Sequence, residues 1–288
     1  MDLSARRQPP TVRLRRLAGE LRGLRSAAGL TREEVSAQTG INVATLYRIE
    51  TAKVRPQKRT LIALLDKYGV TDEDRRSELV ALSRQAAQLG WLQPYESELP
   101  EQYMTYISFE AEARSVRNYE GLFVPGLLQT EAYARAVITG VLPLAGQQQI
   151  QDRVDVRVQR QASLRRKTPL RLWAVLDEAA LHRTVGGPGV MKEQLEQLIR
   201  AAEEPHVTLQ VIPFEAGAHP GMPGSFVVMD FPDPADPDLV YTDSMAGDLF
   251  LERDADVRRY AMIFQHLQAA ARSPADSLTM ISARAREL

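Results

Sequence analysis

The first part of the chain is patterned for helices, because its apolar residues recur every three or four positions. Leu14, Leu17, Leu21 and Leu24 have this spacing and predict a first helix that begins after Thr11. Similar spacing, with acidic residues or glycines at the ends, predicts four more short helices, at 32–39, from 43 onward, at 57–68 and from 71 onward. Five short helices this close together predict a compact all-α head.

The stretch 30–56, LTREEVSAQTGINVATLYRIETAKVRP, organises this head. Gly40 separates its two helices at a reversal where glycine takes a positive φ at little steric cost. Asn42 is a favourable N-cap for the second helix, on which Leu46 and Ile49 face the core. The outer face of that helix is left to Val43, Ala44, Tyr47 and Arg48.

The pattern changes in the second half of the chain. After an irregular segment, helices are predicted at 105–120, 127–140 and 147–167, and again at the C-terminus. Between them lie four apolar runs typical of strands, at 170–176, 207–214, 225–231 and 239–244. The first two strands are separated by helices and could be parallel, whereas the last two are joined by PDPADPD and predict a hairpin.

These elements predict an α+β protein: an all-α, five-helix, repressor-like head followed by a helix-rich domain with a small mixed β-sheet. The predicted boundaries are a head at 1–88, a linker at 89–101 and an α+β domain at 102–288.

Charge separates the same two parts. Residues 1–80 carry 16 Lys and Arg against 10 Asp and Glu, a net charge of +6, whereas the remaining residues carry 20 against 27, a net charge of −7. A basic head on an acidic body is typical of a DNA-binding protein that has a separate second function.

The head resembles the Cro and phage-repressor-like regulators, which bind DNA through a helix-turn-helix motif. The apolar, small and glycine positions of that motif are filled here by Val35, Ser36, Gly40, Ile41, Leu46 and Ile49. In a helix-turn-helix the second helix lies in the major groove and its N-terminal residues reach base edges.

This placement predicts base contacts from Val43, Ala44, Tyr47 and Arg48, of which Arg48 suits guanine and the two small apolar residues suit thymine methyl groups. Contacts to phosphates are predicted from Arg32, Asn42, Thr45, Lys53, Arg55, Lys58 and Arg59.

The C-terminal half resembles a domain found in an actinobacterial regulator family. The segments that carry the resemblance are FVPGLLQTEAYARAV, LWAVLDEAALHR, VTLQVIPFEAGAHPGMPGSF and FPDPADPDLVYTDSMAGDLFLE. These proteins are similar to the WhiJ-type developmental regulators, which join a Cro/repressor-like head to an antitoxin-like C-terminal domain of unknown function. The resemblance implies a transcription factor whose partner is a short protein encoded next to it.

Candidate chemistry in the second half is sparse. Its four histidines, His182, His206, His219 and His266, lack the spacing of metal ligands, and the aspartates after residue 230 lack the pattern of a calcium loop. Asp177 and Glu178 fit either a catalytic carboxylate pair or the cap of a helix, and the second is the simpler interpretation. The Gly- and Pro-rich loop 215–225 fits either a ligand or partner site or an unusual connection. We therefore predict no catalytic residue, no metal and no cofactor.

The sequence contains no cysteine, and no run of about 18 apolar residues that would span a membrane. The chain is thus expected to be a cytoplasmic, non-enzymatic regulator that binds double-stranded DNA, acts as a homodimer, and uses its C-terminal domain for dimerisation, partner binding or ligand sensing. Two alternatives remain: an enzyme or ligand-binding α+β domain tethered to DNA, and an interaction module whose head no longer reads DNA.

Overall fold

The computed structural model describes residues 11–85, 90–95, 98–234, 236–244 and 247–288. By its internal contacts the chain divides into two compact units, Met1–Glu112 and Ala113–Leu288, which are described one at a time. The polar segment 1–10 and the predicted end of the head at residue 88 lie outside the described residues.

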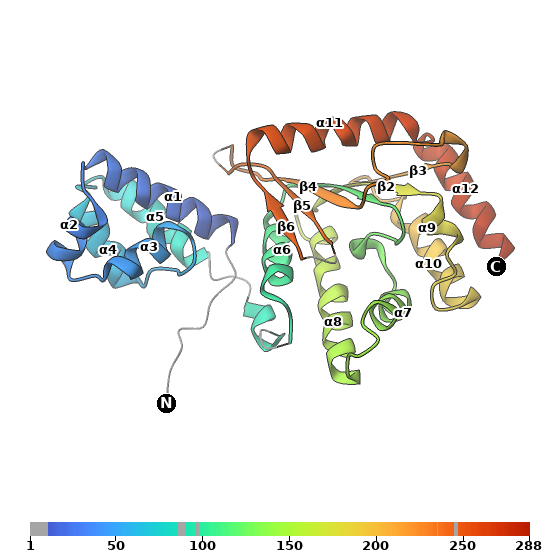
Figure 1. Ribbon diagram of the computed structural model, residues 1–288, viewed down its shortest axis with the longest axis horizontal. Coiled ribbons are helices and arrows are strands. Elements are labelled where there is room, and N and C mark those ends of the chain that lie inside the picture. Colours follow the sequence, from blue (N-terminus) through green and yellow to red (C-terminus); the bar gives the residue numbers. More distant parts are fainter. Residues whose placement is uncertain (1–10, 86–89, 96–97, 235, 245–246) are drawn as a thin grey trace. The chain divides into compact units, whose positions relative to one another are not determined.

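The first unit is all helical among its described residues (Figure 1). Its elements are α1 (Val12–Ala27), α2 (Arg32–Thr39), α3 (Val43–Glu50), α4 (Lys58–Lys67), α5 (Glu73–Gln85), the 3-10 helix η1 (Gly90–Tyr95) and α6 (Glu101–Glu112). The five helices predicted for the head correspond to α1–α5, and η1 lies inside the segment predicted as a linker.

The predicted apolar stripes build the core of this unit. Residues from all of the first five helices form one cluster, with Leu17, Val35, Leu46, Leu61 and Leu79 each at most 1% exposed. α6 is attached to α1, because the Arg15 guanidinium carbon lies 4.7 Å from the centre of the Phe109 ring. The backbone N–H of Arg13 also donates to the Glu112 carboxylate at 3.2 Å.

The second unit contains a six-stranded sheet with helices on both faces (Figure 1). Its strands are β1 (Ser115–Glu120), β2 (Arg171–Asp177), β3 (Val207–Ile212), β4 (Phe226–Asp230), β5 (Leu239–Thr242) and β6 (Leu249–Leu251). Its helices are η2 (Gly126–Leu128), α7 (Glu131–Val141), α8 (Gln147–Arg160), η3 (Gln161–Leu164), α9 (Ala179–His182), α10 (Pro188–Ala201), η4 (Phe214–Ala216), α11 (Asp254–Ala270) and α12 (Pro274–Glu287).

The sheet is mixed, with the strand order β3-β2-β1-β4-β5-β6. β1, β2 and β3 are parallel to one another, and β4 pairs antiparallel with β1. β5 and β6 extend the sheet with further antiparallel pairings, β5 with β4 and β6 with β5. The α+β class is therefore confirmed, as are the parallel pairing of 170–176 with 207–214 and the hairpin of 225–231 with 239–244.

One prediction in this region was wrong. The segment 105–120 was expected to be a single helix, but α6 ends at Glu112 and β1 follows at Ser115. β1 lies in the centre of the sheet, where Val116 pairs with Leu172 on one side and with Met229 on the other. Two ladders of hydrogen bonds therefore outweigh the charged residues that made this segment look helical. β6, a three-residue edge strand, was not predicted.

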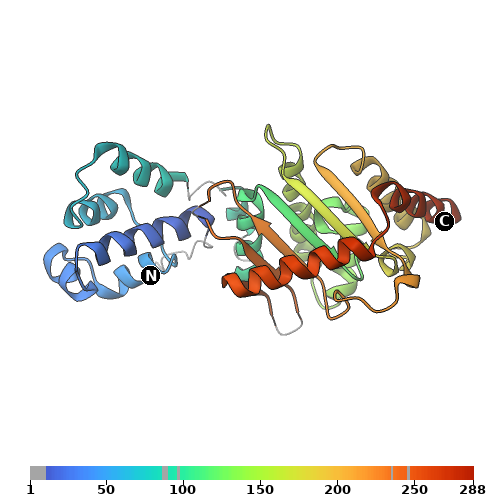
Figure 2. The ribbon, with the colours of Figure 1, turned by 90° about the horizontal axis from the view of Figure 1, so that it is seen from above.

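The two faces of the sheet are covered differently. α11 crosses one face diagonally (Figure 2), where Phe264 and Leu267 pack on Phe226, Val228 and Val240. α7, α8 and α10 lie on the opposite face (Figure 1). At the β3 edge, the Val211 N–H donates to the Ser277 hydroxyl of α12 at 2.9 Å, so part of this edge is closed.

Candidate DNA-binding interface

The junction of α2 and α3 has the geometry of a helix-turn-helix. Thr31 and Glu34 form a capping box at the start of α2, because the hydroxyl of Thr31 accepts from the Glu34 N–H and the Glu34 carboxylate accepts from the Thr31 N–H. α2 ends at Gly40, whose φ of 71° is in the left-handed region as predicted. Asn42 then caps α3, with its side-chain oxygen accepting from the Ala44 N–H at 2.8 Å.

α3 separates a buried face from an open one. Leu46 and Ile49 are 1% and 2% exposed and fix the helix to the core of the head. Ala44, Tyr47 and Arg48 are exposed on the opposite face, beside the half-buried Val43. The four predicted base-contacting residues therefore belong to one accessible surface of α3.

Tyr47 is the centre of a small cationic cluster. Its ring centre lies 5.4 Å from the Arg32 guanidinium carbon and 5.6 Å from the Lys53 ammonium nitrogen. At these distances cations are attracted to an aromatic ring. Two of the predicted phosphate contacts are thus brought together around a predicted base contact.

A buried carboxylate below this cluster was not predicted. Glu50 is 3% exposed, and its two oxygens accept from Arg25 Nε at 2.7 Å and from Arg32 Nε at 2.8 Å. The hydrogen bond to Glu50 raises the pKa of Arg25, and burial, followed by the charge of Glu50, raises the pKa of Tyr68 to about 12. The signal was present in the sequence, because Glu50 follows Leu46 by four positions and so lies on the buried face of α3.

The segment after α3 turns sharply and is fixed to the helix. The N–H groups of Lys53 and Val54 both donate to the carbonyl oxygen of Arg48, at 2.8 and 3.2 Å. Ala52 makes this turn with a φ of 56°, which is uncommon for a residue other than glycine. Its methyl group is buried with Leu14 and Ala18, so packing holds the turn in place.

The N-terminus of α4 is open to anions. Its first two residues, Lys58 and Arg59, are exposed, and no acidic residue stands in its first turn. Gln57 at the N-cap makes no side-chain capping hydrogen bond, so the first N–H groups of the helix have no side-chain acceptor there. Free N–H groups, the positive end of the helix dipole and two cations together favour a phosphate.

The other predicted phosphate contacts lie in different settings. Asn42 is exposed and uses only its oxygen as a cap, whereas Thr45 is half-buried on α3. Arg55 is also half-buried, and one of its N–H groups donates to the Ser83 carbonyl at 3.3 Å.

In the second unit, two carboxylates at the C-terminal end of β2 hold neighbouring segments in place. Asp177 accepts from the Ala179 N–H at 2.8 Å and pairs with His219 Nε2 at 3.1 Å. The other ring nitrogen of His219 accepts from the Gly221 N–H at 3.3 Å. Both ring nitrogens therefore bind the chain itself, and they fix the loop 215–225 against the end of β2.

Glu178 also holds a neighbouring segment in place. One of its oxygens accepts from the Phe214 N–H at 2.7 Å, and the other lies 3.3 Å from His182 Nε2. The loop 215–225 approaches the sheet closely at Gly221, where a Cβ atom would lie 2.6 Å from the Tyr119 ring. This close approach is a physical reason for the small residues of the loop.

A second shielded acid that was also missed from the sequence is Glu120, which lies partly buried at the end of β1. Burial of the Glu120 carboxyl group raises its pKa to about 7, and the charge of Asp243 acts in the same direction. Hydrogen bonds from Ser225 and Asn118 and the charge of Arg157 oppose this shift without cancelling it. The carboxyl group is thus balanced between its protonated and ionised forms near neutral pH.

Within the part of the chain that the structure describes, no three His, Asp or Glu residues are grouped so as to hold a metal ion. None of its described helices is both long and apolar enough to cross a membrane.

Two family models match the chain. A model described as a helix-turn-helix domain matches residues 16–79, which include α2 and α3. A model described as a domain of unknown function (DUF5753) matches residues 103–283. Searches of curated proteins and of solved structures found no match. In front of the residues matched by the second model, the chain thus carries a helix-turn-helix domain. The second model covers more than half of the sequence, and the chain therefore belongs to the DUF5753 family.

Proposed function

We propose that this protein is a sequence-specific DNA-binding transcriptional regulator of the WhiJ type, with a repressor-like head. α3 enters the major groove, Arg48 and its neighbours read base edges, and the basic segment after α3 holds the phosphates. The observation that carries the proposal is the open face of α3 next to the uncapped, cationic N-terminus of α4. Two consecutive helices of the head thus offer base-reading and phosphate-binding groups.

We further propose that the protein acts as a homodimer and that its second unit serves binding rather than catalysis. A single head covers only a few base pairs, so useful specificity requires two heads on spaced half-sites. In the second unit, Asp177, Glu178 and His219 are occupied in fixing loops, which supports a structural use of the carboxylate pair. Dimerisation, a ligand or a short partner protein are the binding roles open to this unit.

The experiment is selection of binding sites from random double-stranded DNA by the full chain. We expect an enriched motif made of two related half-sites. An Arg48→Ala chain should lose enrichment at particular positions, whereas Arg22→Ala, an exposed arginine on α1, should enrich the same motif as the wild type. Recovery of random sequences by the wild-type chain would exclude sequence-specific recognition.

A further inference from the structure

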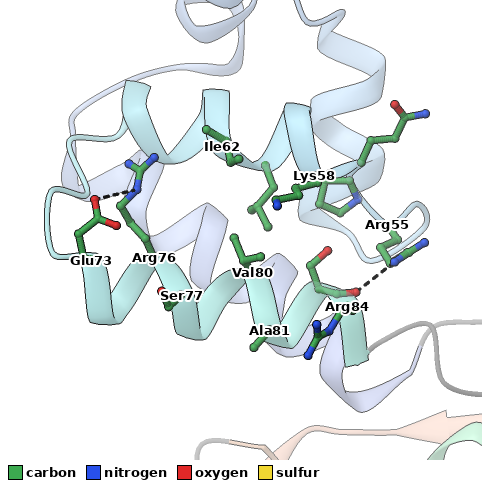
Figure 3. Close-up of a pocket in the computed structure, with 13 residues that line it drawn as sticks. Arg55, Lys58, Ile62, Glu73, Arg76, Ser77, Val80, Ala81 and Arg84 are labelled. Atoms are coloured by element: carbon green, nitrogen blue, oxygen red, sulfur yellow. Dashed lines mark hydrogen bonds and ion pairs between the residues drawn. The ribbon is translucent and has the colours of Figure 1, made fainter.

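A groove runs between α4 and α5 on the head (Figure 3). Its volume is about 630 Å³, and its floor is apolar, with Ile62 from α4 facing Val80 and Ala81 from α5. Ile62, Val80 and Ala81 are only partly buried, so the core of the head does not use all of their apolar surface. The lining residues of α5 run from Glu73 to Arg84, which corresponds to about 16 Å at 1.5 Å per residue.

The charges of the groove are unequal at its two ends. Arg55, Lys58 and Arg84 stand at one end (Figure 3). Among the described residues neither Lys58 nor Arg84 forms an ion pair, and Arg55 contacts only the uncharged Ser83 carbonyl in the groove.

At the other end the positive charge is neutralised. Arg76 lies 2.7 Å from an oxygen of Asp66 and 3.9 Å from one of Glu73. The groove is therefore an apolar channel with an uncompensated cluster of three cations at one end.

From this arrangement we infer that the α4–α5 groove binds a short amphipathic helix of a partner protein. The helix places apolar residues on the floor and acidic residues over Arg55, Lys58 and Arg84. A channel about three helical turns long between two helices matches the way in which amphipathic helices are bound, through apolar side chains at i, i+3 or i+4 and i+7. The cation cluster sets the direction of the helix, since its acidic end must lie there.

Two other occupants fit the groove less well. DNA would satisfy the cations and leave the apolar floor uncovered, because a phosphodiester backbone has no apolar groups for it. A second copy of the same groove would bring two cation clusters together, and like charges at an interface oppose association.

Arg55 and Lys58 line the groove and are also predicted phosphate contacts. The competition between partner and DNA that follows from this therefore rests on the proposed function. The acidic helix and the DNA backbone would require the same two cations. Binding of one therefore weakens binding of the other, and thermodynamic linkage makes the effect reciprocal. A partner that fills the groove would release the protein from DNA.

The test is selection from a displayed library of helical 15-residue peptides, with the full chain as bait and no DNA present. We expect enriched peptides to be acidic and to share apolar residues at i, i+3 or i+4 and i+7. Ala81→Glu, which places a charge on the floor, and Lys58→Glu, which reverses one cation at an exposed position, should each weaken a selected peptide at least tenfold. Arg22→Glu, on the exposed face of α1, is the matched control and should bind as the wild type does.

In a second step the strongest peptide is added to the complex of the chain with its selected DNA site, and the apparent DNA affinity should fall at least tenfold. Because the first step contains no DNA, loss of the proposed DNA function would leave its result unchanged. The inference would be overturned if no peptide were enriched, or if a scrambled peptide or the Ala81→Glu chain bound equally well. Self-association of the wild-type chain that Ala81→Glu abolishes would assign the groove to a second copy and overturn it as well.

Discussion

Arg32 at the start of α2 donates from Nε to Glu50 Oε2 at the end of α3, at 2.8 Å, although 18 residues separate them in the sequence. Arg25 of α1 donates to the other oxygen of the same carboxylate. One buried acid on α3 therefore links this helix to α1 and α2 and helps to fix its orientation. The side chains of Arg25 and Arg32 are 13% and 30% exposed, so this network is shielded from solvent far more than an ordinary surface ion pair.

Glu50→Ala should strongly destabilise the head. The substitution leaves two arginines without their acid in a shielded site, and breaking a buried ion pair in this way costs about 3–5 kcal/mol. Thermal unfolding of the full chain, followed by circular dichroism, should show that helical structure is lost at a lower temperature than in the wild type. Glu78→Ala is the control, because Glu78 is half exposed and pairs with Arg75 at the surface; such pairs contribute about 1 kcal/mol or less. Equal effects of the two substitutions would contradict a structural role for the buried carboxylate.

Arg48→Ala should weaken binding to the selected DNA site by about 1–3 kcal/mol and leave binding to random DNA nearly unchanged. The physical reason is that the exposed guanidinium can donate two hydrogen bonds to guanine, which random sequences offer only by chance. Fluorescence anisotropy with both DNAs at one salt concentration measures the difference. An equal loss on both DNAs would reassign Arg48 to the phosphates.

Neutralising a phosphate contact should act differently. Lys53→Ala, Lys58→Ala and Arg59→Ala should each lower the affinity for every DNA sequence, because the lost contact is to the backbone. Each should also flatten the slope of log K against log salt by about 0.9. Arg22→Ala is again the control. A slope that none of the three substitutions changes would place the phosphates elsewhere.

Arg32→Ala separates two roles that the structure gives to one residue. Its Nε is committed to Glu50, while its side chain remains 30% exposed and lies beside Tyr47. We expect the variant to unfold at a lower temperature, and we expect its slope of log K against log salt to be smaller by about 0.9. Earlier unfolding with an unchanged slope would make Arg32 a positioning residue for α3 and remove it from the predicted phosphate contacts.

Much of the head could be predicted because its signals are local. The spacing of Leu14, Leu17 and Leu21, the glycine at position 40 and the cap at Asn42 each act within one or two helical turns. The same reasoning placed the four predicted base-contacting residues on one face of α3. The Glu50 network was missed because its two arginines lie on other helices, so no local pattern links them.

The second unit was less predictable for the same reason. β1 owes its strand conformation to β2 and β4, which follow it by more than 50 and 100 residues in the sequence. The hairpin of β4 and β5 was predicted correctly, because its strands are close together in the sequence. The groove between α4 and α5 depends on how two correctly predicted helices pack, which helical periodicity alone does not determine.

The pH dependence of stability should reveal the partly buried Glu120. Its pKa is about 7 in the folded chain, mainly because of burial, against an ordinary value of 4.5 in an unfolded chain. The folded state thus holds the proton more tightly, and stability is full below about pH 4.5 and falls as the pH rises through 7.

Glu120→Gln, which cannot ionise, should escape this loss. In urea unfolding of the full chain it should exceed the wild type by up to about 3 kcal/mol at pH 8 and by much less at pH 5. Glu193→Gln, an exposed acid on α10, serves as the control and should show no such difference between the two pH values. A Glu120→Gln chain that is no more stable than the wild type at pH 8 would mean that the carboxylate is fully compensated by Arg157, Ser225 and Asn118.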